Sequence, residues 1–112
     1  MGFREHVALQ SLDGAVVVDA RDEHLNPHGS VHGGLLATML DVAMGNAVAE
    51  AGGERPVTVA LSVTYLEPGQ RGRLSATARV RKRGKRLIIV EGEVQQDGDV
   101  LADALATFSV PA

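Results

Sequence analysis

The chain has 112 residues, of which 45% are hydrophobic and 22% charged, and its net charge at pH 7 is −3. This composition is typical of a globular protein, so we expect one domain spanning residues 1–112. The absence of cysteine excludes disulfide frameworks, thiolate metal sites and cysteine nucleophiles. With no recognisable signal peptide, no apolar run of membrane-spanning length and a negative net charge, we expect a cytoplasmic protein whose partners include neither membrane nor nucleic acid.

The elements alternate between strand and helix patterns. Residues 12–20 have a valine-rich centre and predict a strand, and residues 21–31 have loop composition. Residues 31–51 carry apolar side chains at helical spacing, with Ser30 as the expected N-cap. Four strand-like segments follow, separated by turn residues, at 56–66, 73–82, 86–95 and 100–110. We therefore predict an α+β fold in which a four-strand antiparallel meander, together with the first strand, curls around one long helix.

Alternation along the first of these four segments divides its side chains between two faces. Leu61, Val63 and Tyr65 fall on one face, and Thr58 falls on the other with Ser62. The Asp97-Gly98 pair between the last two segments is typical of a tight β-hairpin.

The helix begins with two glycines and carries one acid in its apolar middle. Gly33 and Gly34 lie in the first turn, where backbone amides have no partner within the helix and the dipole is positive. Their bare amides could bind an anion or an oxyanion, although glycine would also allow close packing against a strand. Asp41 shares a helix face with small residues, which suggests either a packed seam holding a catalytic carboxylate or a water-facing strip.

The separation of Gly33 and Asp41 constrains any joint role. Eight residues of helix span about 12 Å along the axis. A base and an oxyanion donor must both lie within a few ångströms of the same carbonyl. One helix therefore cannot supply both, whereas two chains related by a two-fold axis could. For an enzyme, we expect an active site shared between subunits.

Three histidines, at positions 24, 28 and 32, are spaced four apart, which on a helix would align them for a metal ion. Pro27 and Gly29 interrupt that stretch and make a helix there improbable. We therefore expect no metal site and no cofactor.

Basic residues are concentrated in one part of the chain. Residues 68–90 hold eight of the eleven Lys and Arg residues and no acid. The pattern fits a solvated hairpin and equally a binding site for a small polyanion. Nucleic acid is a weaker explanation, because no aromatic side chains interleave with the basic ones.

The spacing of Asn, His-Gly-Gly and Asp resembles the hotdog-fold acyl-CoA thioesterases of the phenylacetate-pathway (PaaI-like) group. The residues that carry the resemblance are Asn26-x5-His32-Gly33-Gly34-x6-Asp41, Pro56-Val57-Thr58-Val59 and Val63-Thr64-Tyr65-Leu66-x-Pro68. The family implies a hotdog fold, in which a curved antiparallel sheet wraps one long central helix. It also implies homodimers with shared active sites, usually paired into tetramers, and an acyl-CoA substrate.

The resemblance assigns roles position by position. Asp41 is similar to the catalytic carboxylate that activates water or attacks the thioester, and the Gly33 amide of the partner subunit to the oxyanion donor. Asn26 corresponds to a residue that positions the thioester carbonyl or the water. His32 corresponds to an orienting neighbour, and Thr58 to a hydroxyl that assists Asp41.

The remaining expectations concern substrate binding. Coenzyme A carries phosphates, which would account for the basic hairpin. The candidate substrate-binding residues are Gly34, Arg81, Lys82, Arg83, Lys85 and Arg86. Aryl, hydroxyaryl and medium-chain acyl groups all remain open. Two alternatives stand beside the thioesterase: a non-catalytic acyl-CoA-binding module, and a hotdog hydratase or dehydratase, whose usual His and acid pair in a different motif is not found.

Overall fold

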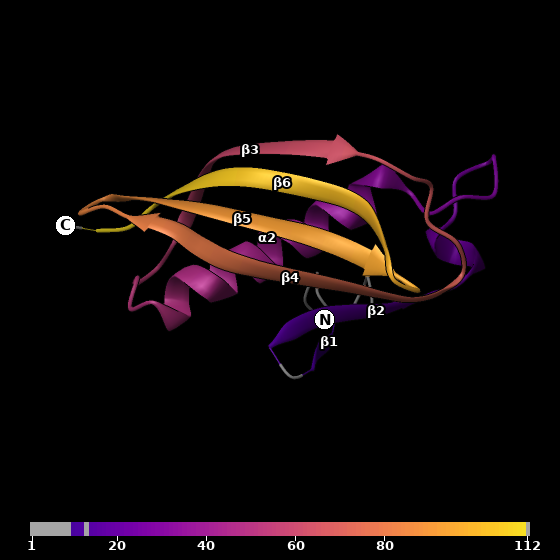
Figure 1. Ribbon diagram of the computed structural model, residues 1–112, viewed down its shortest axis with the longest axis horizontal. Coiled ribbons are helices and arrows are strands. Elements are labelled where there is room, and N and C mark those ends of the chain that lie inside the picture. The colour runs from indigo at the N-terminus through magenta and orange to yellow at the C-terminus, as the bar shows by residue number, and fades with distance from the viewer. Residues whose placement is uncertain (1–9, 13, 112) are drawn as a thin grey trace.

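The computed structural model describes residues 10–12 and 14–111. Within these ranges the chain forms six strands, one short 3-10 helix and one long α-helix (Figure 1). In chain order they are β1 (Gln10–Leu12), β2 (Ala15–Ala20), η1 (Asp22–His24), α2 (Gly33–Glu50), β3 (Val57–Tyr65), β4 (Gly72–Arg83), β5 (Leu87–Gln96) and β6 (Asp99–Ser109).

The strands form one curved antiparallel sheet in the order β1-β2-β4-β5-β6-β3, with α2 against one of its faces (Figure 1). The predicted α+β architecture is confirmed. The expected four-strand meander is wrong, because β3 pairs with β6 and β4 pairs with β2. The connection from β3 to β4 crosses the end of the sheet, where the amides of Leu66 and Glu67 both donate to the carbonyl of Leu101. This crossing leaves β3 as an edge strand.

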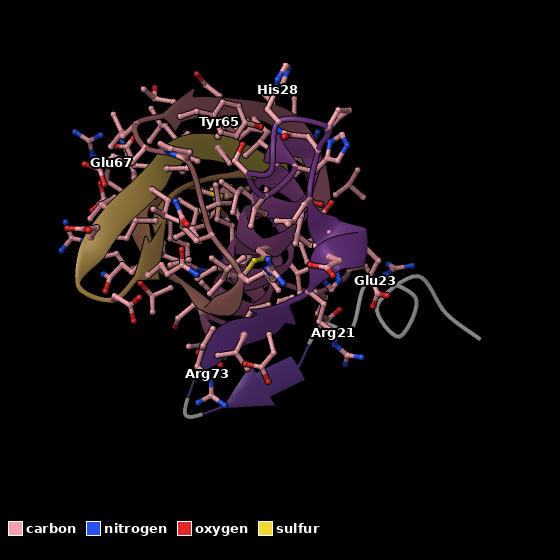
Figure 2. The ribbon with its side chains drawn as sticks, turned by 90° about the vertical axis from the view of Figure 1, so that its right-hand side faces the viewer. Arg21, Glu23, His28, Tyr65, Glu67 and Arg73 are labelled. Atoms are coloured by element: carbon pink, nitrogen blue, oxygen red, sulfur yellow. The ribbon has the colours of Figure 1, made fainter. Side chains whose placement is uncertain are left out.

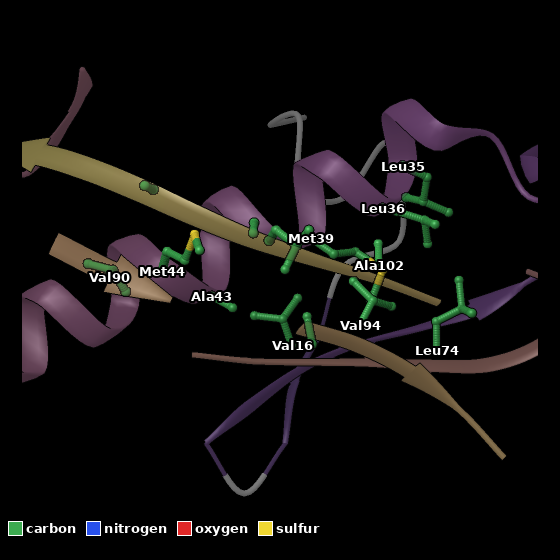
Figure 3. Packing of buried hydrophobic residues seen from close by; sticks show 14 of the residues in the cluster. Val16, Leu35, Leu36, Met39, Ala43, Met44, Leu74, Val90, Val94 and Ala102 are labelled. Carbon is green, nitrogen blue, oxygen red and sulfur yellow. The ribbon is translucent and has the colours of Figure 1, made fainter. Parts of the chain in front are cut away.

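The helix is held by its apolar stripe. Its buried side chains recur every three or four residues, and they are Leu35, Leu36, Met39, Leu40, Ala43, Met44 and Val48. They pack against valine, leucine and alanine side chains from the concave face of the sheet (Figure 3). Gly92, in the middle of β5, has no room for a side chain: an added Cβ would lie 2.9 Å from the Thr77 carbonyl oxygen and 3.3 Å from Cε of Met44. Because β5 has no side chain at this point, α2 can approach the sheet closely.

The start of α2 differs from the prediction. The N-cap is His32, not Ser30, and it makes no side-chain capping bond. Val31 forms a β-bridge with Leu25 and donates its amide to the Gly69 carbonyl at 2.8 Å. The chain therefore remains extended through residue 31, and Gly33 becomes the first helical residue.

The hairpin between β5 and β6 agrees with its sequence pattern. Asp97 and Gly98 both have positive φ, at 51° and 86°, as the two-residue turn that fits strand twist requires. In the part of the chain that the structure describes, no helix is long and apolar enough to cross a bilayer.

Candidate active site

A hydrogen bond joins the middle of α2 to the start of β3. The Thr58 hydroxyl donates to Oδ1 of Asp41 at 2.6 Å. The short distance is typical of a hydroxyl bonded to an ionised carboxylate. The bond orients the carboxylate, and Oδ2 of Asp41 has no hydrogen-bond donor in the part of the chain that the structure describes. Asp41 is half-buried and Thr58 exposed, so the pair lies at the rim between the helix and the sheet edge.

A β-bulge makes this bond possible. Thr58 pairs with Phe108 and Ala60 with Thr107, so Val59 is an extra residue in β3. Strict alternation would place Thr58 on the face opposite Leu61, and that prediction is wrong. Because of the bulge, Thr58 and Leu61 share the face that looks toward α2. Bulges commonly re-aim a side chain at the edge of a sheet or next to an active site.

The helix start forms a second cluster, in which Tyr65 holds Gly33. The Tyr65 hydroxyl donates to the Gly33 carbonyl at 3.0 Å. A Cβ added at Gly33 would lie 3.2 Å from the Tyr65 ring, whereas one added at Gly34 would meet nothing within 4 Å. Close packing of Tyr65 therefore favours glycine at position 33, whereas no described part of the chain crowds position 34.

Within the described residues, two backbone amides at this helix start have no acceptor. The Leu35 and Leu36 amides bond to the His32 carbonyl, but those of Gly33 and Gly34 have no acceptor among the described residues. Gly33 and Tyr65 also line a groove of about 290 Å³, together with Val31, Leu36, Leu66, Glu67, Pro68 and Gly69. A ligand in this groove would lie close to the helix start.

Asn26 closes the loop that precedes the helix. Its Oδ1 accepts from the His28 amide at 2.9 Å and from the Ser30 amide at 3.2 Å, and its Nδ2 donates to the Ser30 hydroxyl at 3.1 Å. Backbone amides can only donate, so these two bonds fix which end of the side-chain amide is oxygen. Asn26 therefore has only its second Nδ2 hydrogen to offer a ligand.

The histidines form hydrogen bonds within the loop, and their side chains do not converge on one point. The His32 amide donates to the His24 carbonyl at 2.9 Å, and Nδ1 of His24 accepts from the Arg21 amide at the same distance. The side chains of His28 and His32 are exposed, and His28 projects from the loop at this end of the molecule (Figure 2). Residues 10–12 and 14–111 contain no group of three His, Cys, Asp or Glu side chains able to hold a metal ion.

The basic hairpin divides between the two faces of the sheet. Arg83 reaches toward the C-terminal end of α2, where its guanidinium would lie 4.0 Å from a Cβ added at Gly52. Arg81 lines a shallow groove on the opposite face of the sheet, with Arg79 and acids of β5 and β6. Arg79 forms an ion pair with Glu91. Within the described ranges, Arg81, Lys82, Arg83 and Lys85 make no ion pair with an acid.

The structure thus gathers the predicted site residues into two clusters. One contains Asp41 and Thr58, and the other contains Asn26, His32, Gly33 and Gly34. Eight residues of α2 separate Gly33 from Asp41, or about 12 Å along the axis. Sequence reasoning overlooked Tyr65, although the alternation of β3 had placed it on the face shared with Leu61.

A family model described as Thioesterase superfamily matches residues 28–102. The chain belongs to this superfamily. A Bacillus halodurans protein solved with CoA is 34% identical with a TM-score of 0.89, covering 96% of this chain and 74% of that one. A variant of the phenylacetic acid degradation protein PaaI from Thermus thermophilus is 28% identical with a TM-score of 0.90, covering 97% and 98%.

A curated relative agrees with the structural ones. Human acyl-coenzyme A thioesterase 13 is 35% identical over 83 residues, which are 70% of this chain and 59% of that protein. The predicted hotdog fold and the resemblance to the PaaI-like group are confirmed. The chain is therefore a thioester hydrolase.

We expect substitutions of Asn26 to separate its loop role from its donor role. Asn26→Asp keeps an oxygen for the His28 and Ser30 amides but removes the Nδ2 donor. Its thermal stability should stay close to wild type while thioester hydrolysis falls about tenfold or more. Asn26→Ala should lose both, with stability lower by about 1–2 kcal/mol. The measurements are thermal unfolding and thiol release, with His28→Ala as control. Full activity in Asn26→Asp would show that the Nδ2 donor is not used.

Proposed function

We propose that this thioesterase hydrolyses acyl- or aryl-acyl-CoA to the free acid and CoA, using Asp41 of one subunit and the Gly33 amide of its partner. The observation that carries the proposal is the Thr58–Asp41 hydrogen bond at an unpaired sheet edge, because it presents an oriented carboxylate where a second chain can complete the site. The CoA-containing relative and the human acyl-CoA thioesterase support CoA as the leaving group.

The chemistry uses the free oxygen of Asp41. As a general base, the carboxylate takes a proton from water while the water oxygen attacks the thioester carbonyl carbon. The resulting oxyanion accepts a hydrogen bond from the Gly33 amide and, with Asn26, from an Nδ2 hydrogen. Collapse of this intermediate breaks the C–S bond, and the departing thiolate takes up the proton. As a nucleophile, Asp41 would instead form a mixed anhydride that water then cleaves.

The edge of β3 is suited to bind a second copy of the chain. Val57, Val59 and Tyr65 are exposed by 62%, 59% and 53%, and the strand runs for nine residues with no described strand along one side. A long, exposed apolar edge is a template for strand addition. Antiparallel β3–β3 pairing between two copies would extend the sheet across a two-fold axis.

The two clusters support one position for that axis. Thr58 lies beside Asp41 and Tyr65 beside Gly33, so each end of β3 is registered to one cluster on α2. An axis midway between Thr58 and Tyr65, at Leu61 or Ser62, brings each Gly33 level with the Asp41 of the other chain. This axis is compatible with both the Thr58–Asp41 and the Tyr65–Gly33 hydrogen bonds, and it creates two equivalent sites per dimer. The pairing of dimers into tetramers stays a prediction.

The position of Arg83 suits the phosphates of CoA. Arg83 pairs with Ile88, Ile88 with Phe108 and Phe108 with Thr58, so these residues form one row across the sheet. Three strand spacings amount to about 14 Å between Arg83 and Thr58. The pantetheine arm separates the thioester from the phosphates, so a substrate can react at Asp41 while its phosphates bind near Arg83.

Replacing the carboxylate tests the chemistry. Asp41→Asn preserves shape but removes the base, so kcat should fall by about 100-fold or more while affinity for CoA is retained. Thr58→Val should lower kcat several-fold, and Thr58→Ser should restore it. Thiol release is measured over phenylacetyl-, hydroxybenzoyl-, short-, medium- and long-chain acyl-CoA, with Asp103→Asn as control. If wild type cleaves no thioester faster than Asp41→Asn, a non-catalytic acyl-CoA-binding module becomes the better explanation.

The proposed two-fold axis can be tested with single cysteines, because the natural chain has none. Opposed residues in antiparallel strands lie at Cα separations that a disulfide can bridge. Ser62→Cys or Leu61→Cys should therefore form a covalent dimer under mild oxidation, detected on a non-reducing gel. Thr77→Cys, on β4 and far from the β3 edge, serves as control. A dimeric protein in which neither position cross-links would contradict this pairing.

The two faces of the basic hairpin give a matched pair of charge reversals. Arg83→Glu should raise KM for acyl-CoA about tenfold with little change in kcat, because a charge-assisted bond to phosphate becomes a repulsion. Arg81→Glu changes the same charge on the opposite face and should leave KM within about twofold. If both substitutions raise KM equally, the hairpin acts through its overall positive charge. If neither substitution changes KM, the hairpin is not part of the CoA site.

A further inference from the structure

We propose that the Gly34 amide is a second oxyanion donor beside that of Gly33 and that Tyr65 is its positioning residue, an inference that rests on the proposed function. Tyr65 ends the edge strand β3 and lies at the same end of the molecule as the loop that carries His28 (Figure 2). Its hydroxyl donates to the Gly33 carbonyl at 3.0 Å, although more than half of the residue is exposed. This bond links the sheet edge directly to the first residue of the helix.

The bond acts on the peptide group between Gly33 and Gly34. The carbonyl of Gly33 and the amide N–H of Gly34 belong to the same planar unit, so a hydrogen bond to the oxygen fixes the direction of the N–H. It also polarises that N–H and makes it a stronger donor. The Gly34 amide has no acceptor among the described residues, and the next carbonyl, of Gly34, accepts from the Thr38 hydroxyl at 2.8 Å.

The ring supplies a second restraint. Two consecutive glycines make the helix start the part of α2 with the greatest conformational freedom. The Tyr65 ring covers the place where a Gly33 side chain would be, at 3.2 Å from the added Cβ. It therefore restricts residue 33 from one side, while the space beside Gly34 stays open. Tyr65 thus restricts Gly33 without filling the space beside Gly34.

The dimer proposed above would use this arrangement across the interface. In that pairing Tyr65 lies opposite Val57 or Val59 of the partner subunit, close to that subunit's Asp41–Thr58 pair. Tyr65 would thus hold the donating amides of one chain in register with the carboxylate of the other. Because it acts through the peptide group, its loss should weaken stabilisation of the oxyanion more than binding of CoA.

The test is Tyr65→Phe, which keeps the ring and removes only the hydroxyl. We expect kcat for the best acyl-CoA substrate to fall about three- to tenfold, with KM and the midpoint of thermal unfolding unchanged. Thr64→Val removes a hydroxyl from the same strand but from the opposite face, and it should leave all three quantities unchanged. Gly34→Ala provides a second probe, because its methyl group meets no part of the chain but stands beside the free amide: stability should hold or rise while kcat falls.

Each other outcome contradicts the inference. A change in KM that depends on the acyl group would make Tyr65 a substrate contact, and a parallel loss of stability would make it purely structural. If wild type cleaves no acyl-CoA, the proposed function fails. The NMR spectrum of the backbone amides then still tests whether Tyr65 positions the Gly34 amide. Tyr65→Phe should shift the Gly34 amide proton resonance upfield and leave that of Gly52, at the other end of α2, in place. An unmoved Gly34 resonance would overturn the proposal.

Discussion

The burial of one stripe of α2 in the curved sheet is the constraint on which the rest of the molecule depends. With that stripe fixed against the concave face, the half-buried strip of the helix carrying Ala37, Thr38 and Asp41 lies along the β3 edge, with the exposed Gly34 at its start. Small side chains keep that strip close to β3, and the two long-range side-chain bonds to α2 found among residues 10–12 and 14–111 come from this strand. The orientation of the site is thus a consequence of core packing.

Those two bonds are complementary in their chemistry. Thr58 donates to a carboxylate and so holds an acceptor in place, whereas Tyr65 donates to a peptide carbonyl and so holds a donor in place. Hydrolysis of a thioester needs one group of each kind, a base for water and a donor for the oxyanion. In the proposed mechanism one strand therefore positions both groups, and the seven-residue separation of Thr58 and Tyr65 sets the distance between them.

Much of the fold and part of the site could be predicted from the sequence. Helical spacing of apolar residues gave α2, and the Asp97-Gly98 signal gave the β5–β6 turn, because both are local in the chain. The pairing of β3 with β6 and the bulge at Val59 could not be predicted, since each depends on which strands meet in space. The bulge decides whether Thr58 faces Asp41 or solvent. Alternation alone therefore put the correct residue on the wrong face.

Three features that are unfavourable for local secondary structure lie beside the same edge of the sheet. Two glycines open a helix, an acid interrupts an apolar helix, and an edge strand carries a bulge and exposed valines. Each is unfavourable in an isolated chain, through lost helix propensity, costly burial of charge or an open sheet edge. Residues that are locally unfavourable in this way concentrate at functional sites. All three adjoin the β3 edge, which no other described strand pairs, so in the proposed dimer a second chain would offset their cost and complete the active site at the same surface.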